Sequence, residues 1–169
     1  MILVTVGTDG PFDRLVLAVD AWAARSGRND VYAQIGNSGV RPRHIRHEAF
    51  LDPAEFRRQF TQASVVVSHA GMGTILTALQ YRKPLLVMPR RAALGEQRND
   101  HQLATARYLL GLGRITVAAD ETELEAELAR IDELTAREAV GPYAQPELIG
   151  AIRRYIHECQ DPPAPHQSR

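Results

Sequence analysis

The chain has 169 residues, and its 20 Lys and Arg side chains balance its 20 Asp and Glu side chains. This length suits one domain with a single core and leaves no room for a second full domain. The balanced charge excludes a global attraction to nucleic acid or anionic lipid. A single cysteine, Cys159, excludes an internal disulfide framework and fits a reducing compartment, so we expect a cytoplasmic globular protein.

Short apolar runs alternate with amphipathic segments along the first half of the chain. The runs are continuously apolar, which is typical of strands covered on both faces in a parallel sheet. The amphipathic segments carry apolar residues at the spacing of a helix. In chain order, this half predicts a strand at Ile2–Val6, a helix starting at Pro11, a strand at Val31–Ile35, a short strand near Ile45–Phe50 and a helix capped by Asp52. We interpret the basic stretch Arg41–His47 as a solvated loop and sheet edge rather than as a phosphate or lipid contact.

The same alternation continues through the second half. The predicted elements are a strand at Val65–Val67, a helix at Ile75–Arg82, a strand at Leu85–Met88, a helix capped by Asn99 with Gln102, a strand at Ile115–Ala118, a helix capped by Asp120 with Glu123, and a last helix beyond Pro142. Strands that alternate with helices predict an α/β fold with a doubly wound, Rossmann-like parallel sheet.

The C-terminal part of the sequence carries two further predictions. The last helix has an apolar face formed by Leu148, Ile149, Ile152 and Ile156. We favour packing of this face on the domain over docking on a partner. Residues 161–169 are polar and rich in proline, which predicts a disordered tail, so the domain is expected to span residues 1–160.

The stretch Ser68–Thr74 follows an apolar strand and opens a helix. A strand that turns directly into a helix points backbone N–H groups and the positive helix terminus at one spot, which suits a phosphate. Gly71 and Gly73 place no Cβ in the way of a ligand, and Thr74 could cap the helix or donate to a phosphate oxygen. Taken alone, this stretch fits a purely structural turn equally well.

Two other loops at strand ends, Gly7–Gly10 and Pro89–Gln102, also carry glycine or polar residues. The second is longer than the usual connection of about 2–6 residues. Ligands of an open α/β sheet bind at the carboxyl ends of the strands, near a switch in strand order. Three convergent loops of this kind favour phosphate binding over structural turns, and a nucleotide is the expected ligand.

Other classes of site are not indicated. The run Gly7–Gly10 is not the Gly-x-Gly-x-x-Gly fingerprint of dinucleotide binding, no acid closes the second strand, and there is no P-loop. The six histidines are scattered and no Asp-x-Asp pair occurs, so no metal site is expected. The charge of a diphosphate would have to be met by backbone dipoles, hydroxyls and basic side chains.

Three spaced motifs resemble a known family. They are Val4–Thr8 with Pro11–Leu15, then Ser68–Thr74, and then Pro89-Arg90 leading through Gly95-Glu96 to Asp100-His101-Gln102. In this order, residues 1 to about 135 resemble the C-terminal, donor-binding domain of family 28 glycosyltransferases. The resemblance is closest to small stand-alone subunits, those of bacterial exopolysaccharide glycosyltransferases and the catalytic half of the eukaryotic two-subunit enzyme that adds N-acetylglucosamine to dolichol-linked sugars. It implies a single GT-B half-domain, a UDP-sugar donor, inversion at the anomeric carbon, no metal or other cofactor, and a membrane-associated partner.

The resemblance also implies roles for individual residues. Those that would bind the donor are Gly7 and Thr8 beside the phosphates, Ser68, His69, Ala70, Gly71, Met72, Gly73 and Thr74 around the diphosphate, and Asp100, His101 and Gln102 facing the sugar hydroxyls. Glu96 would lie near the same site. Several relatives hold the ribose with a glutamate three residues beyond the Gly-Thr pair, where this chain has Thr77.

His69 and Glu96 are the candidates for catalysis. A helix N-terminus disfavours the cationic form of histidine, so we expect His69 to donate a neutral N–H hydrogen bond to a phosphate or sugar oxygen rather than act as an acid. The base for the acceptor hydroxyl would come from the opposite face of the cleft, outside this chain. The alternative is that His69 and His101 only hydrogen-bond backbone groups.

These observations predict the donor-binding and catalytic subunit of a glycosyltransferase that moves a hexose from a UDP-sugar to a lipid-linked acceptor in polysaccharide synthesis. The expected partners are the UDP-sugar and a membrane-anchored acceptor-binding subunit that holds the chain at the inner face of the membrane. No nucleic acid is expected, and a homo-oligomer is left open. The alternatives are a sugar-nucleotide epimerase-like enzyme, which needs a closed two-domain cleft, and a non-catalytic nucleotide-sugar-binding module.

Overall fold

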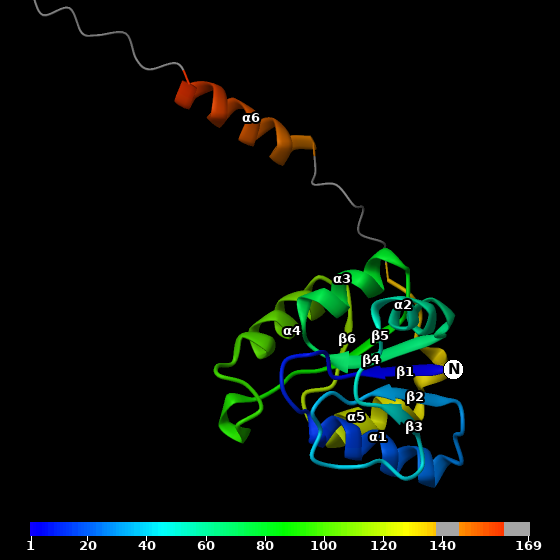
Figure 1. Ribbon diagram of the computed structural model, residues 1–169. Coiled ribbons are helices and arrows are strands. Elements are labelled where there is room, and N and C mark those ends of the chain that lie inside the picture. The colour runs from blue at the N-terminus through cyan, green and yellow to red at the C-terminus, as the bar shows by residue number, and fades with distance from the viewer. Residues whose placement is uncertain (138–145, 161–169) are drawn as a thin grey trace, which may run out of the picture.

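The computed structural model describes residues 1–137 and 146–160, with side chains up to His157. Its centre is a six-stranded sheet in the order β3-β2-β1-β4-β5-β6, with every pairing parallel (Figure 1). The strands are β1 (Ile2–Thr5), β2 (Val31–Gln34), β3 (Arg46–Glu48), β4 (Val65–His69), β5 (Leu85–Met88) and β6 (Thr116–Val117). The predicted doubly wound α/β fold is confirmed.

Helices cover both faces of the sheet. One face carries α1 (Asp13–Ser26) and α5 (Glu121–Ala129), and the other carries α2 (Pro53–Gln62), α3 (Met72–Gln80) and α4 (His101–Gly111), as Figure 1 shows. Two short 3₁₀ turns, Ala92–Leu94 and Ile131–Glu133, lie between these elements, and α6 (Pro146–Gln160) follows. The layers are helix, sheet and helix, which is the arrangement that βαβ units produce.

Each face of the sheet has its own apolar core, because alternate residues of a strand point to opposite sides. On one face, Val4 of β1 packs in a cluster with Trp22 of α1 and Leu124 of α5. On the other face, Leu3 of the same strand joins a cluster that includes Ile75 of α3. Burial on both sides is the physical reason that the strands are continuously apolar rather than alternating.

Two of the predicted helix caps are confirmed. The Asp52 carboxylate accepts hydrogen bonds of 3.0 Å from two N–H groups in the first turn of α2. Asp120 does the same for α5, and Glu123 accepts a bond of 2.8 Å from the N–H of Ala119, the residue before the N-cap. These caps fix the entry of the chain into both helices.

The predicted capping pair of Asn99 and Gln102 is wrong, because Asn99 lies one residue before the N-cap and Gln102 does not cap the helix. The N-cap of α4 is Asp100, and the Asn99 side chain accepts from the N–H of His101 at 3.1 Å. Gln102 instead turns inward and is 3% exposed, with its Oε1 atom accepting from the N–H of Arg90 at 3.2 Å. The buried N–H of Arg90, at the start of the connection between β5 and α4, therefore binds the side chain that the sequence pattern assigned to the helix end.

Other boundaries move by one to three residues. β4 continues through Ser68 and His69, so that only Ala70 and Gly71 form the turn and Met72 is already helical. Helix α1 begins at Asp13 rather than at Pro11, and β6 keeps two of the four residues predicted for it. The glycine-rich stretch is thus a strand end plus the first turn of a helix, with little loop between them.

The apolar face of α6 does not pack on the sheet domain in this structure. Leu148, Ile152 and Ile156 are 54%, 51% and 46% exposed, and Figure 1 shows the helix lying apart from the body of the molecule. The packing that the sequence favoured is therefore not observed. The tail predicted at 161–169 lies outside the described residues. None of the described helices combines the length and apolar character needed to cross a membrane.

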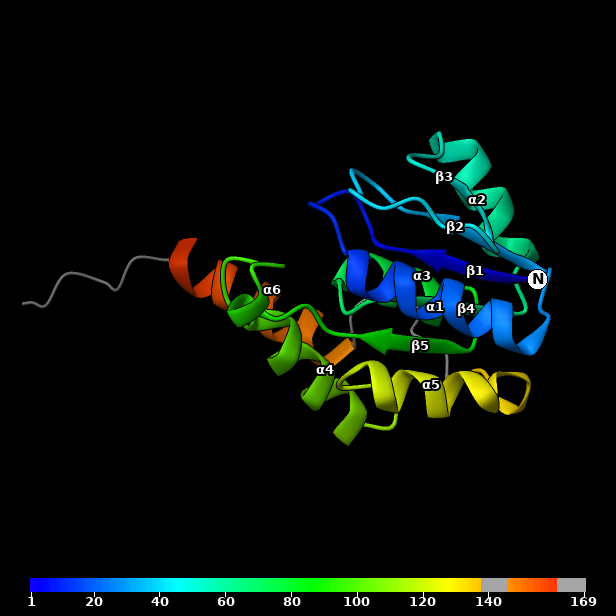
Figure 2. The same cartoon turned by 90° about the horizontal axis from the view of Figure 1, so that it is seen from below.

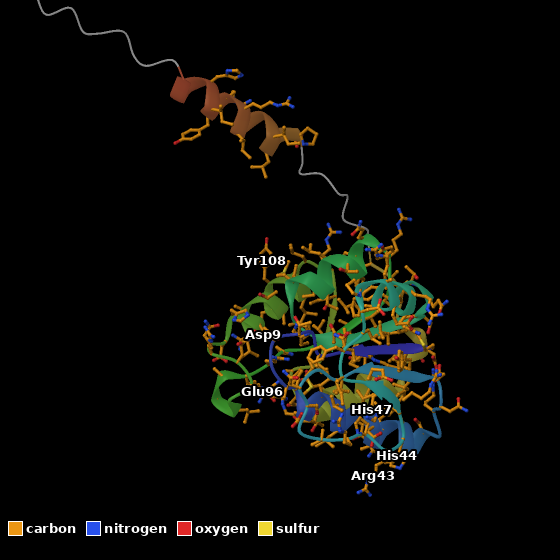
Figure 3. The ribbon with its side chains drawn as sticks, in the orientation of Figure 1. Asp9, Arg43, His44, His47, Glu96 and Tyr108 are labelled. Atoms are coloured by element: carbon orange, nitrogen blue, oxygen red, sulfur yellow. The ribbon has the colours of Figure 1, made fainter. Side chains whose placement is uncertain are left out.

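Asp20 of α1 fastens the basic stretch to the domain. Its Oδ1 atom accepts from the backbone N–H groups of His44 at 2.7 Å and Ile45 at 3.1 Å, and Arg43 N–H lies 3.1 Å from both oxygens. Burial alone would raise the pKa of Asp20, but the hydrogen bonds from His44 and Arg43 outweigh it and lower the pKa below its usual value. The side chains of Arg43 and His44 point outward, as Figure 3 shows, so the stretch is a solvated loop with a buried anchor.

Asp20→Asn should lower the free energy of unfolding by about 2–4 kcal/mol, because hydrogen bonds to a charged group contribute roughly 1.5–3 kcal/mol each. A lowered folded pKa means that this contribution is present above the unfolded pKa of about 3.9 and is lost as the pH falls through the folded value. Urea unfolding at about pH 7 and about pH 3 measures it. The difference between wild type and variant should shrink in acid, and an equal difference at both pH values would contradict the assignment.

Candidate functional site

Three loops meet at one edge of the sheet. The strand order grows outward from β1 through β2 and β3 on one side and from β4 through β5 and β6 on the other. Because the strands are parallel, the loops that leave β1, β4 and β5 emerge at the same carboxyl edge (Figure 2). The reversal between β1 and β4 is the kind of switch point at which open α/β sheets bind ligands.

A cavity of about 510 Å³ opens beside this switch point. The loop after β1 contributes Gly7 and Thr8, and the first turn of α3 contributes Gly73 and Thr74. The rest of the wall comes from β2, α2 and the loop before it, and α3, with apolar residues Leu51, Phe56, Phe60 and Tyr81 and polar residues Gln34, Arg57, Thr77 and Gln80. The cavity therefore joins an apolar section to the end of a helix.

The N-terminus of α3 is suited to an anion. Its N-cap is Gly71, which has no side chain to accept the first N–H groups, and the first bond inside the helix runs from Ile75 N–H to Gly71 at 3.1 Å. An α-helix leaves the N–H groups of its first turn without intrahelical partners and carries a positive partial charge at this end. Gly73 and Thr74 bring that end to the cavity wall.

His69 packs between two glycines. A Cβ built on Gly7 would lie 2.6 Å from the ring of His69, and one built on Gly71 would overlap its Nε2 atom. Burial, assisted by the charge of Arg90, lowers the pKa of His69 to about 4. The ring is therefore neutral at pH 7, although burial rather than the predicted helix terminus is the main cause. Its packing requires glycine at both neighbours. Its Nδ1 atom is buried without a hydrogen-bond partner among the described residues.

Stability should fall as the pH drops from about 6.5 to about 4, because the unfolded chain binds a proton at His69 and the folded chain does not. The folded pKa of about 4 lies below the usual 6.5, so the contribution of up to about 3 kcal/mol is complete above pH 6.5 and is lost on acidification. Urea unfolding across this range, compared between wild type and His69→Gln, measures the effect. A slope that persists unchanged in the variant would show that another group titrates.

Glu96 anchors a loop. Its carboxylate pairs with Arg14 of α1 through two hydrogen bonds of 2.7 and 2.8 Å, and it also accepts from the N–H of Arg91 at 2.9 Å. Arg14 donates in addition to the carbonyl of Pro89 at 3.2 Å. Both oxygens of Glu96 are thus used to hold the loop between β5 and α4 against α1. Figure 3 shows Glu96 and Asp9 at the same end of the molecule, but Glu96 does not line the cavity.

Four of the predicted donor-binding residues, Gly7, Thr8, Gly73 and Thr74, line the cavity. The other five residues of the stretch Ser68–Thr74 do not. His69 and Gly71 pack against each other at the end of β4. Ser68 is fully buried in β4, where its hydroxyl donates to the carbonyl of His69 at 2.9 Å, Ala70 is buried, and Met72 is 45% exposed. The side chains that reach the ligand edge are thus fewer than the motif contains.

The residues predicted to contact the sugar, Asp100, His101 and Gln102, lie at the N-terminus of α4. The Asp100 carboxylate accepts from the N–H of Ala92 at 2.9 Å, and the ring of His101 pairs with the Asn99 side chain. Gln102 is buried against Arg90, as described above. Asp100 and Gln102 shape the loop here, and His101 is exposed. The sequence predicted none of these intramolecular contacts.

Sequence reasoning also missed two arginines. Arg14 clamps the loop between β5 and α4 through Glu96, and Arg90 is 1% exposed beneath the loop after β1. Both occur inside the quoted motifs, but in a chain with 20 Lys and Arg residues no local pattern marks a buried one. Within the described residues, no three His, Cys, Asp or Glu side chains gather closely enough to hold a metal ion.

The fold and the site define a class, that of doubly wound α/β domains with a ligand cavity and an uncapped helix N-terminus at the switch point. The model of the glycosyltransferase family 28 C-terminal domain matches residues 1–140. This chain belongs to that family.

Similar proteins carry related names. The chain is 42% identical over 83 residues to UDP-N-acetylglucosamine transferase subunit ALG13 of Eremothecium gossypii, a match that covers 48% of this chain and 37% of that protein. It is 35% identical over 116 residues to the protein of the same name from Mus musculus, covering 63% of this chain and 10% of that one. The chain thus spans well under two thirds of either relative. The NMR solution structure of ALG13 superposes with a TM-score of 0.56 at 19% identity, covering 89% of this chain and 93% of that one, which shows the fold alone.

Proposed function

We propose that this chain is the donor-binding and catalytic subunit of a glycosyltransferase that uses a UDP-sugar. The observation that carries the proposal is the cavity at the switch point, where the uncapped N-terminus of α3 meets the loop after β1. Membership of the family and similarity to proteins named as UDP-N-acetylglucosamine transferase subunits support a UDP-sugar as the ligand.

The two sections of the cavity suit the two parts of a nucleoside diphosphate. The helix end at Gly73 and Thr74 would receive the diphosphate, because its N–H groups and dipole attract negative charge. The apolar section around Phe56 would receive the flat base. The Thr77 hydroxyl donates to the Gly73 carbonyl at 2.7 Å, so it can only accept from a ribose hydroxyl. Gln80 also lines the cavity, and its amide can both donate to and accept from a ribose hydroxyl.

The finer parts of the proposal concern the transfer itself. The cavity is open, and the described residues form one ligand edge, so an acceptor would approach from outside this chain. We assign the acceptor to a lipid-linked molecule, held by a membrane-anchored partner subunit at the inner face of the membrane, with inversion at the anomeric carbon. The word subunit in the names of the relatives supports a partner.

UDP binding should persist in excess EDTA, because the proposed diphosphate site is made of backbone N–H groups and the helix dipole rather than of metal ligands. Isothermal titration of the full chain with UDP, with and without EDTA, measures this. An affinity that disappears in EDTA and returns with magnesium would show that the diphosphate is held through a metal.

The function itself is tested with radiolabelled UDP-sugars and a membrane extract. Transfer of label to lipid supports the proposal. A donor that returns with altered stereochemistry would indicate the epimerase-like alternative, and a donor that is bound and unchanged in the complete system would indicate a binding module. A screen of several UDP-sugars in the same assay identifies the sugar.

A further inference from the structure

Arg90, the second residue after β5, is the largest side chain that is fully buried among the described residues, at 1% exposure. Its guanidinium carbon lies 5.3 Å from the centre of the Phe12 ring, and its backbone N–H donates to Gln102. The proposed function assigns no role to this side chain. A buried arginine is costly unless its donors and its charge are used.

The guanidinium group holds the loop after β1 from below. Its Nη2 atom donates to the carbonyls of Val6 and Gly10 at 2.9 Å each, and its Nη1 atom donates to the carbonyl of Asp9. Three carbonyls of one short loop are thereby drawn toward the interior. They flank Gly7 and Thr8, the two residues of this loop that line the cavity.

Drawing carbonyls inward also orients N–H groups. A trans peptide points its C=O and the following N–H in opposite directions, and the described residues contain no cis peptide bond. The Asp9 carbonyl faces Arg90, so the N–H of Gly10 faces away from it. Gly7 and Gly10 have φ of 75° and 77°, a left-handed backbone that glycine adopts without strain. The loop shape therefore depends on Arg90 and on its glycines together.

The charge of Arg90 has no directly bonded counter-ion. Its guanidinium group donates to carbonyl oxygens, and its Nε atom is buried without a partner among the described residues. Asp9 and Glu96 act on it only through space, and Glu96 is already paired with Arg14. Burial lowers the pKa of Arg90, but a guanidinium keeps its proton in proteins. A positive charge therefore lies directly behind the loop.

We infer that Arg90 is a positioning residue for the donor diphosphate, because it turns the carbonyls of the loop after β1 away from the ligand edge and sets a buried positive charge behind that loop. The inference rests on the proposed function, since it takes a nucleoside diphosphate as the ligand. In a site without a metal, this buried charge adds to the positive N-terminus of α3 and to the side chain of Arg57, which lines the cavity.

The inference separates the diphosphate from the nucleoside. Leu51, Phe56 and Phe60 of the cavity lie on α2 and the loop before it, whereas the guanidinium group of Arg90 donates its hydrogen bonds to the loop after β1. Loss of Arg90 should weaken binding of UDP and leave binding of uridine nearly unchanged. An arginine that merely supports the fold would change the affinity for both ligands equally or for neither.

The test compares Arg90→Met with the matched control Arg91→Met in the full chain. Arg91 is the adjacent arginine, and its guanidinium group donates to the carbonyl of Ala119, away from the loop after β1. Titration calorimetry with UDP and with uridine should show UDP binding at least about tenfold weaker in Arg90→Met, with uridine affinity within about twofold of wild type. The control should change neither affinity by more than about twofold. Equal weakening of both ligands in Arg90→Met, or no weakening, would overturn the inference.

If Arg90→Met does not fold, Arg90→Lys decides, because lysine keeps the charge but lacks the planar fork of donors with which the guanidinium spans the three carbonyls. UDP should then bind more weakly than to wild type by at least about threefold, again with uridine affinity unchanged. Wild-type affinity for UDP in this variant overturns the inference.

Amide NMR of the wild-type chain gives a second measurement. The N–H signals of Thr8, Asp9 and Gly10 should shift with UDP and not with uridine, and unmoved signals would also overturn it. A wild-type chain that fails to bind UDP refutes the proposed function itself. UDP affinity that is the same in wild type and in the Arg90 variants refutes only this inference.

Discussion

Gly73→Val should weaken UDP binding by at least about 100-fold, or about 2.8 kcal/mol, while leaving the fold intact. Gly73 lies in the first turn of α3 and on the wall of the cavity. A Cβ at this position meets nothing within 4 Å, so the protein has space for the new side chain. The proposed diphosphate needs that same space, and the valine branches would exclude it from the helix N–H groups.

The stability of this variant should be close to that of wild type. Glycine is the poorest helix former apart from proline, by roughly 1 kcal/mol relative to alanine, and valine is somewhat better than glycine. Thermal unfolding and titration with UDP, measured on the same preparation, separate binding from folding. Gly111→Val is the matched control, since Gly111 is also helical, also has open space around its Cβ position, and lies at the far end of α4. Unchanged UDP affinity in Gly73→Val would show that the donor does not bind in this cavity.

Gly71→Val should behave differently, although the two glycines look equivalent in the sequence. A Cβ on Gly71 would overlap the ring of His69, so this variant should lose thermal stability and UDP binding together. Sequence analysis assigned both glycines the same role, that of leaving space for a ligand, whereas the structure shows that Gly71 leaves space for the ring of His69. If Gly73→Val instead loses stability as much as Gly71→Val, the whole stretch is a structural turn and the phosphate interpretation fails.

The sequence predicted the parts of the fold that depend on local pattern. A strand buried on both faces, such as Leu85–Met88, can be predicted from a short run of apolar residues. A helix cap such as Asp52 can be predicted in the same way, because its hydrogen bonds involve residues only two or three positions away. The three-loop edge followed from the alternation of strands and helices, because parallel strands end at the same side of the sheet.

The contacts between distant residues that hold the loops of the site in place could not be predicted in the same way. Glu96 meets Arg14 across 82 positions of sequence, and Arg90 reaches Val6 across 84. A carboxylate near a glycine-rich loop fits both a catalytic group and an anchor, and only its distant partner decides between them. The inward turn of Gln102 also escaped the sequence pattern, since its partner Arg90 lies at the other end of the connection between β5 and α4.

The second large effect concerns transfer. The full chain alone should bind the UDP-sugar but transfer no sugar above background, and a membrane fraction with the partner subunit should raise transfer by at least about 100-fold. Sugar transfer needs an acceptor hydroxyl held in line with the anomeric carbon and a site closed to water, and positioning of this kind provides roughly 7–11 kcal/mol of catalysis. The described residues offer one open edge.

The two candidate catalytic side chains of this chain, His69 and Glu96, are not free to act as the base for the acceptor hydroxyl. His69 is neutral and packed between glycines, and both oxygens of Glu96 are engaged by Arg14 and Arg91. A second polypeptide would therefore bring the base for the acceptor hydroxyl together with the acceptor. The exposed apolar face of α6 is compatible with such a partner, because Ile152 and its neighbours have no cover on this domain.

The decisive assay uses purified full chain, radiolabelled UDP-sugar and membranes from cells that lack the second subunit, to which that subunit is then restored. Label should enter lipid only after restoration, and it should stay absent when the restored membranes receive Gly73→Val in place of wild type, because that variant cannot load the donor. The variant control matters, since it ties the transferred sugar to the cavity on this chain rather than to another enzyme in the membranes. Robust transfer by wild type before restoration would mean that the chain is a complete enzyme, with its acceptor wall supplied by its own residues.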